Sequence, residues 1–120
     1  MNALGSKIKV CNTDPMTGWR RDGFCSTDDN DIGTHIVCAK VTSAFLNFTK
    51  SRGNDLVSKT PFFPGLKEGD KWCLCVSRWI EAYLAGVAPY IDAEATNIAT
   101  FRYLKYANIP EEELNKYILK

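Results

Sequence analysis

The sequence has no long apolar run, no excess of one charge and only one histidine. Its apolar runs are all shorter than the roughly 18 residues that a helix needs to cross a bilayer. The 15 lysines and arginines against 14 aspartates and glutamates leave a net charge of +1. Such a balance offers no basic surface for a phosphate backbone. We therefore expect neither a nucleic acid nor a membrane as partner.

The N-terminal residues also lack the apolar segment and the small-residue cleavage site of a secretory signal. We therefore expect a cytoplasmic protein whose five cysteines are reduced thiols, and an odd number also fits a complete disulfide framework badly. At 120 residues the chain is long enough to bury a stable core without disulfide or metal cross-links. We predict one globular domain over residues 1–120, and we assign no cofactor.

Two stretches are typical of a buried strand that continues into a helix. In the first, a strand over residues 35–41 leads through an N-cap at Thr42 to a helix that Gly53 ends. In the second, residues 72–76 form a strand, Ser77 is the N-cap and Gly86 ends the helix. Successive strands that are joined through helices are usually parallel. We therefore predict an α/β fold, an α+β two-layer sandwich: a small, largely parallel or mixed sheet with helices packed on it and long ordered loops.

The remaining elements are shorter. Alternating residues 6–11 predict an edge strand, and a third short strand is expected within residues 87–96. A helix capped by Thr96 or Asn97 should follow, and Pro110 suits the first position of a final helix. The loops 12–33 and 54–71 carry enough apolar residues that we expect both to pack on the core.

Six short runs, spread in order over about residues 11–96, carry a resemblance to a known family. These runs are Cys11-Asn12-Thr13-Asp14-Pro15, Arg21-Asp22-Gly23-Phe24-Cys25, His35-Ile36-Val37-Cys38-Ala39, Arg52-Gly53-Asn54-Asp55-Leu56, Phe63-Pro64-Gly65-Leu66 and Gly69-Asp70-Lys71-Trp72-Cys73-Leu74-Cys75. They resemble the family catalogued as domain of unknown function 2237. The resemblance implies a compact two-layer α/β domain, mostly from bacteria, with no established activity. Members of that family often carry a histidine where this chain has Asn97.

Thiol chemistry is one candidate function. Alternation along the second strand puts Trp72 and Leu74 on one face and Cys73 and Cys75 on the other. Cys75 would then lie at the carboxyl end of the strand, with Arg78 in the first turn of the helix. A helix N-terminus and a guanidinium both stabilise a thiolate, so Cys75 would be a nucleophile or a redox-responsive thiol. Cysteine also serves as a small buried hydrophobe, and we favour that interpretation.

His35 is the single histidine and hence the natural general base. Parallel strands would put His35 at the amino end and Cys75 at the carboxyl end, roughly 13 Å apart. We therefore do not expect a direct pair of these two residues, and Cys73 would be the better partner. A structural role for His35 is favoured over a catalytic one.

Metal binding is a third possibility. The five cysteines and His35 offer enough soft ligands for zinc, but no paired Cys-x-x-Cys motif occurs. The acidic run of residues 28–33 resembles a calcium loop, yet Ile32 occupies a ligand position. We assign no metal ligands and keep a structural zinc domain as an alternative.

Binding without catalysis is the preferred hypothesis. Loop residues and a helix start carry the polar side chains that recognition sites use. The candidate ligand-binding residues are Asp14, Arg21, Asp22, Asn54, Asp55, Ser77 and Arg78. Helix starts at Thr42, Ser77 and Thr96 would share one edge of a parallel sheet and form an anion pocket. The aspartates fit equally well as caps of their own turns.

We therefore predict a domain that binds an anionic small molecule or a protein partner at its strand-to-helix junctions. The first alternative is a thiol-dependent enzyme or redox-responsive protein that uses Cys75, Arg78, His35 and Cys73. The second alternative is a structural zinc domain.

Overall fold

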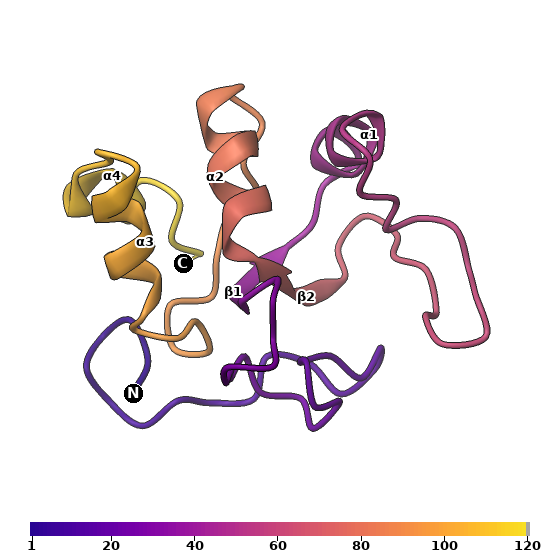
Figure 1. Ribbon diagram of the computed structural model, residues 1–120, viewed down its shortest axis with the longest axis horizontal. Coiled ribbons are helices and arrows are strands. Elements are labelled where there is room, and N and C mark those ends of the chain that lie inside the picture. Colours follow the sequence, from indigo (N-terminus) through magenta and orange to yellow (C-terminus); the bar gives the residue numbers. More distant parts are fainter. Residues whose placement is uncertain (120) are drawn as a thin grey trace.

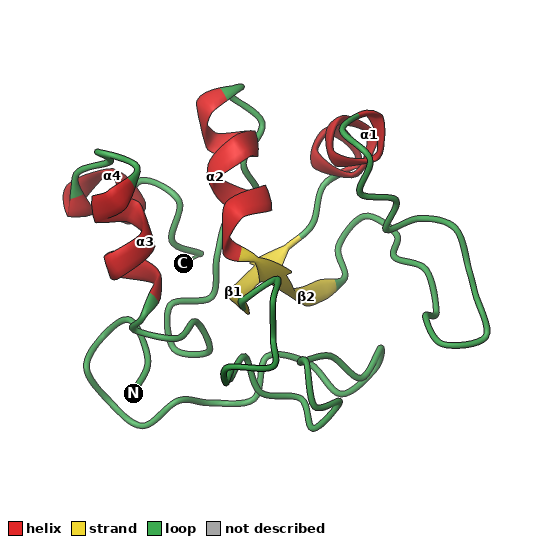
Figure 2. Ribbon diagram, viewed as in Figure 1, coloured by secondary structure: helices red, strands yellow, loops and turns green. Residues whose placement is uncertain are grey.

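The computed structural model describes residues 1–119 and contains two strands and four helices (Figures 1 and 2). In chain order they are β1 (His35–Lys40), α1 (Ser43–Ser51), β2 (Lys71–Cys75), α2 (Val76–Leu84), α3 (Thr100–Tyr106) and α4 (Glu111–Asn115). Figure 1 shows the helices above the two-stranded ribbon and the N-terminal loop, coloured indigo to purple, below it. Long loops join these elements, as Figure 2 shows in green. The α+β class is confirmed.

The two strands are antiparallel, so the prediction of a largely parallel or mixed sheet is wrong. The reason lies in the long connection after α1, which returns to the end of β1. There the Val41 N–H donates to the Asp70 carbonyl at 2.9 Å, and the Gly69 N–H donates to the Val41 carbonyl at 2.9 Å. The second strand therefore begins where the first one ends and runs back beside it.

The two faces of the ribbon carry different cores. Val37, Trp72 and Leu74 belong to the main apolar core, in which Trp79 of α2 is fully buried. Cys38 and Cys73 instead belong to a separate buried cluster of cysteines. Their separation follows from strand alternation, because successive side chains point to opposite faces.

The two longer helices begin differently. α1 begins as predicted, because the Thr42 hydroxyl accepts a hydrogen bond from the Phe45 N–H at 3.1 Å. α2 does not use Ser77 as its cap: β2 continues into the helix without a turn, and Cys75 is the N-cap. The last residue of β2 therefore also occupies the N-terminus of α2.

Disulfides attach the N-terminal loop to the ribbon. Cys11 is bonded to Cys38 and Cys25 to Cys73, so the expectation of five reduced thiols is wrong. Among residues 1–119, Cys75 is the free cysteine. The loop 12–33 is packed as predicted, because disulfides hold Cys25 within it and Cys11 directly before it to the strands.

Several short elements differ from prediction. Residues 6–11 form no strand, and Ile91 makes isolated bridges to Ala39 and Ile118 where a third strand was expected. α3 begins at Thr100 rather than directly after Asn97, and α4 follows Pro110. In the described part of the chain, no helix has the length and apolarity to cross a membrane.

Candidate functional site

His35 and Cys75 lie directly opposite each other across the ribbon. The register pairs His35 with Cys75 and then Val37 with Leu74, so Ile36 is an extra residue that forms a bulge in β1. Opposed residues of an antiparallel pair point to the same face, with Cβ atoms about 4.5–5.5 Å apart. Bulges often re-aim a side chain beside a functional site. The prediction that these two residues lie at distant strand ends is therefore wrong, because it assumed parallel strands.

Asp31 holds the imidazole ring of His35 in place. Its Oδ1 atom lies 2.6 Å from His35 Nδ1, and its Oδ2 atom accepts a hydrogen bond from the His35 backbone N–H at 2.9 Å. The Thr27 hydroxyl donates to the same Oδ2 atom at 3.0 Å. The Asp31 side chain is fully buried, whereas 38% of the His35 side chain is exposed. The carboxylate is thus hidden behind a ring that solvent or a ligand can reach.

The electrostatics of Asp31 determine which ring nitrogen of His35 carries the proton. Burial is the largest influence on its pKa and raises it, but hydrogen bonds from the His35 backbone, the His35 ring and Thr27 together hold the pKa below its ordinary value. An ionised carboxylate only accepts hydrogen bonds. We therefore place the proton on His35 Nδ1, which leaves a lone pair on Nε2. A histidine in this tautomer can act as a general base.

Gly33 makes room for the ring. A Cβ atom at this position would lie 2.5 Å from Cε1 and 2.9 Å from Nε2 of His35. Real Cβ atoms do not approach ring atoms this closely, and the ring cannot withdraw without leaving Asp31. The ring of His35 is therefore held between a carboxylate and a backbone that has no side chain.

Cys75 places its sulfur at the start of α2. The residue is half-buried, and its Sγ atom lies 3.1 Å from the Ser77 hydroxyl. The first N–H groups of a helix have no acceptor within the helix. The backbone N–H groups of Ser77 and Arg78 also have no partner elsewhere in residues 1–119. Two unused hydrogen-bond donors therefore lie two and three residues after Cys75, in the first turn of α2.

Two adjoining hollows give access to His35 and Cys75. We call the first the Cys75 recess; it has a volume of about 50 Å³ and is lined by His35, Asn54, Leu56, Trp72, Cys73, Leu74 and Cys75. We call the second the Arg21 cleft; it has a volume of about 460 Å³ and is lined by Trp19, Arg21, His35, Leu56, Phe63, Trp72 and Cys73. Because the two share His35 and Trp72, a molecule in the cleft would lie next to the recess.

Arg21 supplies the positive charge of the cleft. Its guanidinium carbon lies 5.1 Å from the centroid of the Trp72 ring, and Nη1 donates to the Gly18 carbonyl at 2.7 Å. None of the ion pairs within residues 1–119 involves Arg21. Its charge is therefore available to an anion that enters the cleft.

Comparison with known proteins gives a family. The model of a family described as an uncharacterized protein conserved in bacteria (DUF2237) matches residues 1–115. The chain belongs to this family. A search of curated proteins finds no match. The DUF2237 description names no activity, so the function of this chain has to be argued from its site.

Several predicted residues of this DUF2237 chain lie outside the site. Asp22 and Asp55 cap their own turns, because their Oδ1 atoms accept backbone N–H groups of Phe24 and Val57 at 3.0 and 2.9 Å. A hydrogen bond with the Ser58 side chain is the main reason why the pKa of Asp55 falls to about 2. Asp14 is exposed in the N-terminal loop. The turn-capping interpretation therefore holds for Asp22 and Asp55.

Two predicted catalytic residues are engaged elsewhere. The Arg78 guanidinium donates to the Arg52 carbonyl at 3.0 Å and to Glu81 at 3.3 Å, and Arg78 does not line the recess. Cys73 is bonded to Cys25 and has no thiol to offer to His35. The predicted edge of clustered helix starts is also wrong, because α1 and α2 leave opposite ends of an antiparallel ribbon.

Six of the residues predicted from the sequence lie at this site. Arg21, His35, Asn54, Cys73 and Cys75 line the two hollows, and Ser77 contacts the sulfur of Cys75. Sequence reasoning missed Asp31, Gly33 and Trp72 as site residues. The spacing of four between Asp31 and His35 was the available signal, but the acidic run was interpreted as turn residues and a weak calcium loop.

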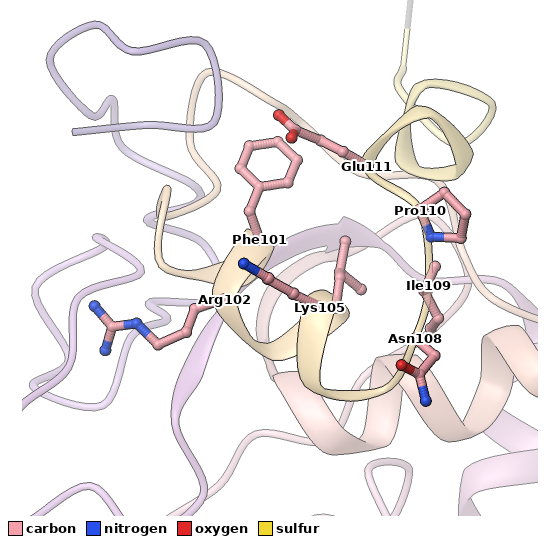
Figure 3. A pocket seen from close by; sticks show the side chains of 8 residues that line it. Phe101, Arg102, Lys105, Asn108, Ile109, Pro110 and Glu111 are labelled. Atoms are coloured by element: carbon pink, nitrogen blue, oxygen red, sulfur yellow. The ribbon is translucent and has the colours of Figure 1, made fainter.

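A separate cavity lies between α3 and α4. It has a volume of about 650 Å³, and its lining includes Arg102 and Lys105 of α3 and Pro110 and Glu111 at the start of α4 (Figure 3). Figure 3 shows only carbon, nitrogen and oxygen side chains around it, with no thiol or imidazole. None of the candidate catalytic or ligand-binding residues predicted from the sequence lines this cavity, and its lining offers no nucleophilic group beyond a lysine.

Proposed function

We propose that this protein is a thiol-dependent enzyme of acyl transfer or hydrolysis that acts on a small anionic molecule. In this proposal Cys75 is the nucleophile, His35 is the general base and Asp31 positions His35. The observation that carries the proposal is the register pairing of His35 with Cys75, beside the hydrogen bond between His35 and Asp31. A nucleophile, a base and a group that orients the base are the minimal set for such chemistry.

The proposed reaction has two steps. In the first, the Cys75 thiol gives its proton to His35 Nε2, and the sulfur attacks the carbonyl carbon of the substrate. The positive end of α2, whose N-cap is Cys75, stabilises the charge of the oxyanion. The leaving group then takes the proton from His35. In the second step a water loses its proton to His35 and cleaves the thioester, which restores the thiol.

Backbone conformation supports a functional role for this part of the chain. Thr34, which precedes His35, has a φ of 50°, and Arg21 has a φ of 54°. Both lie in the left-handed region that residues other than glycine rarely adopt, and for a β-branched residue the strain is pronounced. Strained residues persist where the surroundings fix them, and they cluster at functional sites. Arg21 lines the Arg21 cleft, and Thr34 directly precedes His35, which lines both hollows. A strained residue therefore lies at or next to each hollow.

The Arg21 cleft indicates the substrate class. The guanidinium of Arg21 would bind a carboxylate or phosphate group, because a planar donor pair matches these anions. Trp72 and Phe63 meet edge to face with ring centroids 5.2 Å apart, and they form an apolar wall beside Arg21. An acyl compound with an apolar body and a terminal anionic group fits both features. We thus keep the prediction of an anionic ligand, but we propose Arg21 rather than the helix starts as the group that binds it.

A cytoplasmic location stays a prediction. A free thiol at Cys75 suits a reducing compartment, whereas the two disulfides are typical of an oxidising one.

Activated esters test the proposal. We expect the p-nitrophenyl monoester of succinic acid to release nitrophenol in a burst and to leave a succinyl group on Cys75, which peptide mass mapping locates. The neutral p-nitrophenyl acetate should react more slowly, and Cys75→Ser should show no burst. An acyl group found only on lysines, or an unchanged burst in Cys75→Ser, would refute a cysteine enzyme.

A further inference from the structure

We infer that four cysteines, once reduced, form a binding site for one zinc ion. The four residues, here the four-cysteine cluster, are Cys11, Cys25, Cys38 and Cys73. They are 0 to 5% exposed and lie on the face of the ribbon opposite the main core. The site shares no nucleophile with the proposed enzyme, because Cys75 is outside the cluster. Either proposal can therefore fail without the other.

The strand register brings the four sulfurs together. Cys38 and Cys73 are direct partners across the ribbon, yet neither is bonded to the other. Each is bonded instead to a cysteine of the N-terminal loop, which crosses that face. The Sγ atoms of Cys11, Cys25 and Cys38 all lie within 4.8 Å of one another, and Cys73 is joined to Cys25. Two disulfides thus lie against each other as a single group of sulfur atoms.

This spacing is close to that of a tetrathiolate. With Zn–S bonds of about 2.3 Å, the sulfurs of a tetrahedral site lie about 3.8 Å apart. The bonded pairs would have to separate, whereas the sulfur of Cys25 already lies within 4.8 Å of the sulfurs of Cys11 and Cys38, to which it is not bonded. The sulfur of Cys73, now bonded to Cys25, would have to move toward Cys11 and Cys38. Four cysteine thiolates in a closed, buried site are a common structural zinc site. A Cys-x-x-Cys motif is not needed here, because the fold, rather than a short sequence motif, brings the cysteines together.

Hydrogen bonds hold the backbone of the cluster independently of the disulfides. The Cys73 N–H donates to the Thr17 hydroxyl at 2.9 Å, and the Cys38 N–H donates to the Thr96 hydroxyl at 3.1 Å. The Cys11 N–H donates to the Gly23 carbonyl at 2.8 Å. Because these bonds do not involve the sulfurs, we expect them to persist on reduction and to keep the cysteines near one another.

The chemistry balances with a dithiol or phosphine reductant. Each disulfide takes up two electrons and two protons and yields two thiols. The four thiols then release four protons and bind one Zn²⁺ as thiolates, so affinity falls as pH falls. Metal would replace the two disulfides as the link between the N-terminal loop and the ribbon. The same chain could therefore keep its fold in an oxidising or a reducing compartment.

Metal titration of the full chain tests the inference. After reduction with a phosphine and removal of the reductant without air, we expect one Co²⁺ per chain with the intense visible bands of tetrahedral thiolate coordination. Zn²⁺ should displace the cobalt in one-to-one ratio and raise the melting temperature of the reduced protein. The oxidised protein should bind neither ion at this site.

Two variants make the result specific to the cluster. Cys75→Ser should bind one cobalt with an unchanged spectrum, whereas Cys38→Ser should lose the four-thiolate spectrum. If Cys38→Ser does not fold, the number of cobalt ions bound per wild-type chain and the cobalt spectrum of Cys75→Ser still test whether the four-cysteine cluster binds the metal. The inference is overturned if reduced wild-type protein binds no stoichiometric metal, or if Cys75→Ser loses the spectrum.

Discussion

The Nδ1 atom of His35 lies 2.6 Å from the Oδ1 atom of Asp31, and this contact fixes the ring of the residue that pairs with Cys75 across the ribbon. Asp31 itself is buried and does not line either hollow. Its effect on a thiol reaction would therefore pass through His35. Asp31, which touches no substrate, would thus influence the reactivity of Cys75 by positioning His35.

Asp31→Asn tests this indirect effect. An asparagine has the same shape, but its amide nitrogen would face one of the donors that Asp31 now accepts from, namely His35 or Thr27. We expect the alkylation rate of Cys75 at neutral pH to fall. We also expect a loss of about 1–3 kcal/mol in the free energy of unfolding, the typical cost of an unmatched buried polar group. Urea unfolding at neutral pH measures the second effect, and an unchanged midpoint would contradict the buried bond network.

The same carboxylate predicts a pH dependence of stability. The pKa of Asp31 is lower in the folded than in the unfolded chain, so its contribution is fully present above an unfolded pKa of about 3.9 and is lost as the pH falls through the folded pKa. The stability difference between the wild type and Asp31→Asn should therefore shrink below about pH 4. Urea midpoints of both proteins across this range provide the measurement. A difference that stays constant into that range would mean that Asp31 is not the group responsible.

Gly33→Ala should displace the ring of His35 while leaving the strands in place. The added Cβ atom would meet Cε1 and Nε2 of the ring, so the ring must leave Asp31. We expect slower alkylation of Cys75 and an unchanged far-UV circular dichroism spectrum. The control is the same substitution in His35→Asn, where it should slow the alkylation no further, because the group through which it acts is already missing. Equal losses in both backgrounds would show that Gly33 acts on something other than the ring.

Arg21 predicts a preference for charged reagents. Iodoacetate and iodoacetamide alkylate thiols alike but differ in charge, and a cation in the adjoining cleft attracts the anion. The ratio of the iodoacetate rate to the iodoacetamide rate at Cys75 should therefore fall in Arg21→Ala. Arg20→Ala is the matched control, because its guanidinium is exposed, is paired with Asp28 and does not line the cleft. Equal ratios in the two variants would argue against Arg21 as the anion-binding group.

Local patterns predicted much of the fold. Residues around Thr42 carried enough information for β1 and α1, because a polar cap and apolar spacing are features of the chain itself. The alternation of Trp72 and Leu74 with Cys73 was likewise confirmed by the two separate cores. Such features depend on near neighbours in sequence, which is why they were accessible.

The direction of β2 relative to β1 could not be predicted from such local patterns. A parallel unit usually connects its helix to the next strand in two to six residues, and here residues 52–70 intervene between α1 and β2. That length allows the chain to return to the end of β1. Once the direction is reversed, His35 meets Cys75, and Cys38 meets Cys73. The pairing of His35 with Cys75 was missed because it depends on the register, whereas the disulfides were missed because the N-terminal sequence and the odd number of cysteines indicated reduced thiols.

The rate of Cys75 alkylation in His35→Asn, compared with the wild type at neutral pH, tests the central claim most directly. General bases contribute about 10²–10⁴-fold to proton transfer, so we predict a rate at least about tenfold lower in the variant, with circular dichroism showing a retained fold. The expected drop should be confined to Cys75, because the other four cysteines are bonded in disulfides. A folded His35→Asn protein whose Cys75 reacts as fast as that of the wild type would contradict the account.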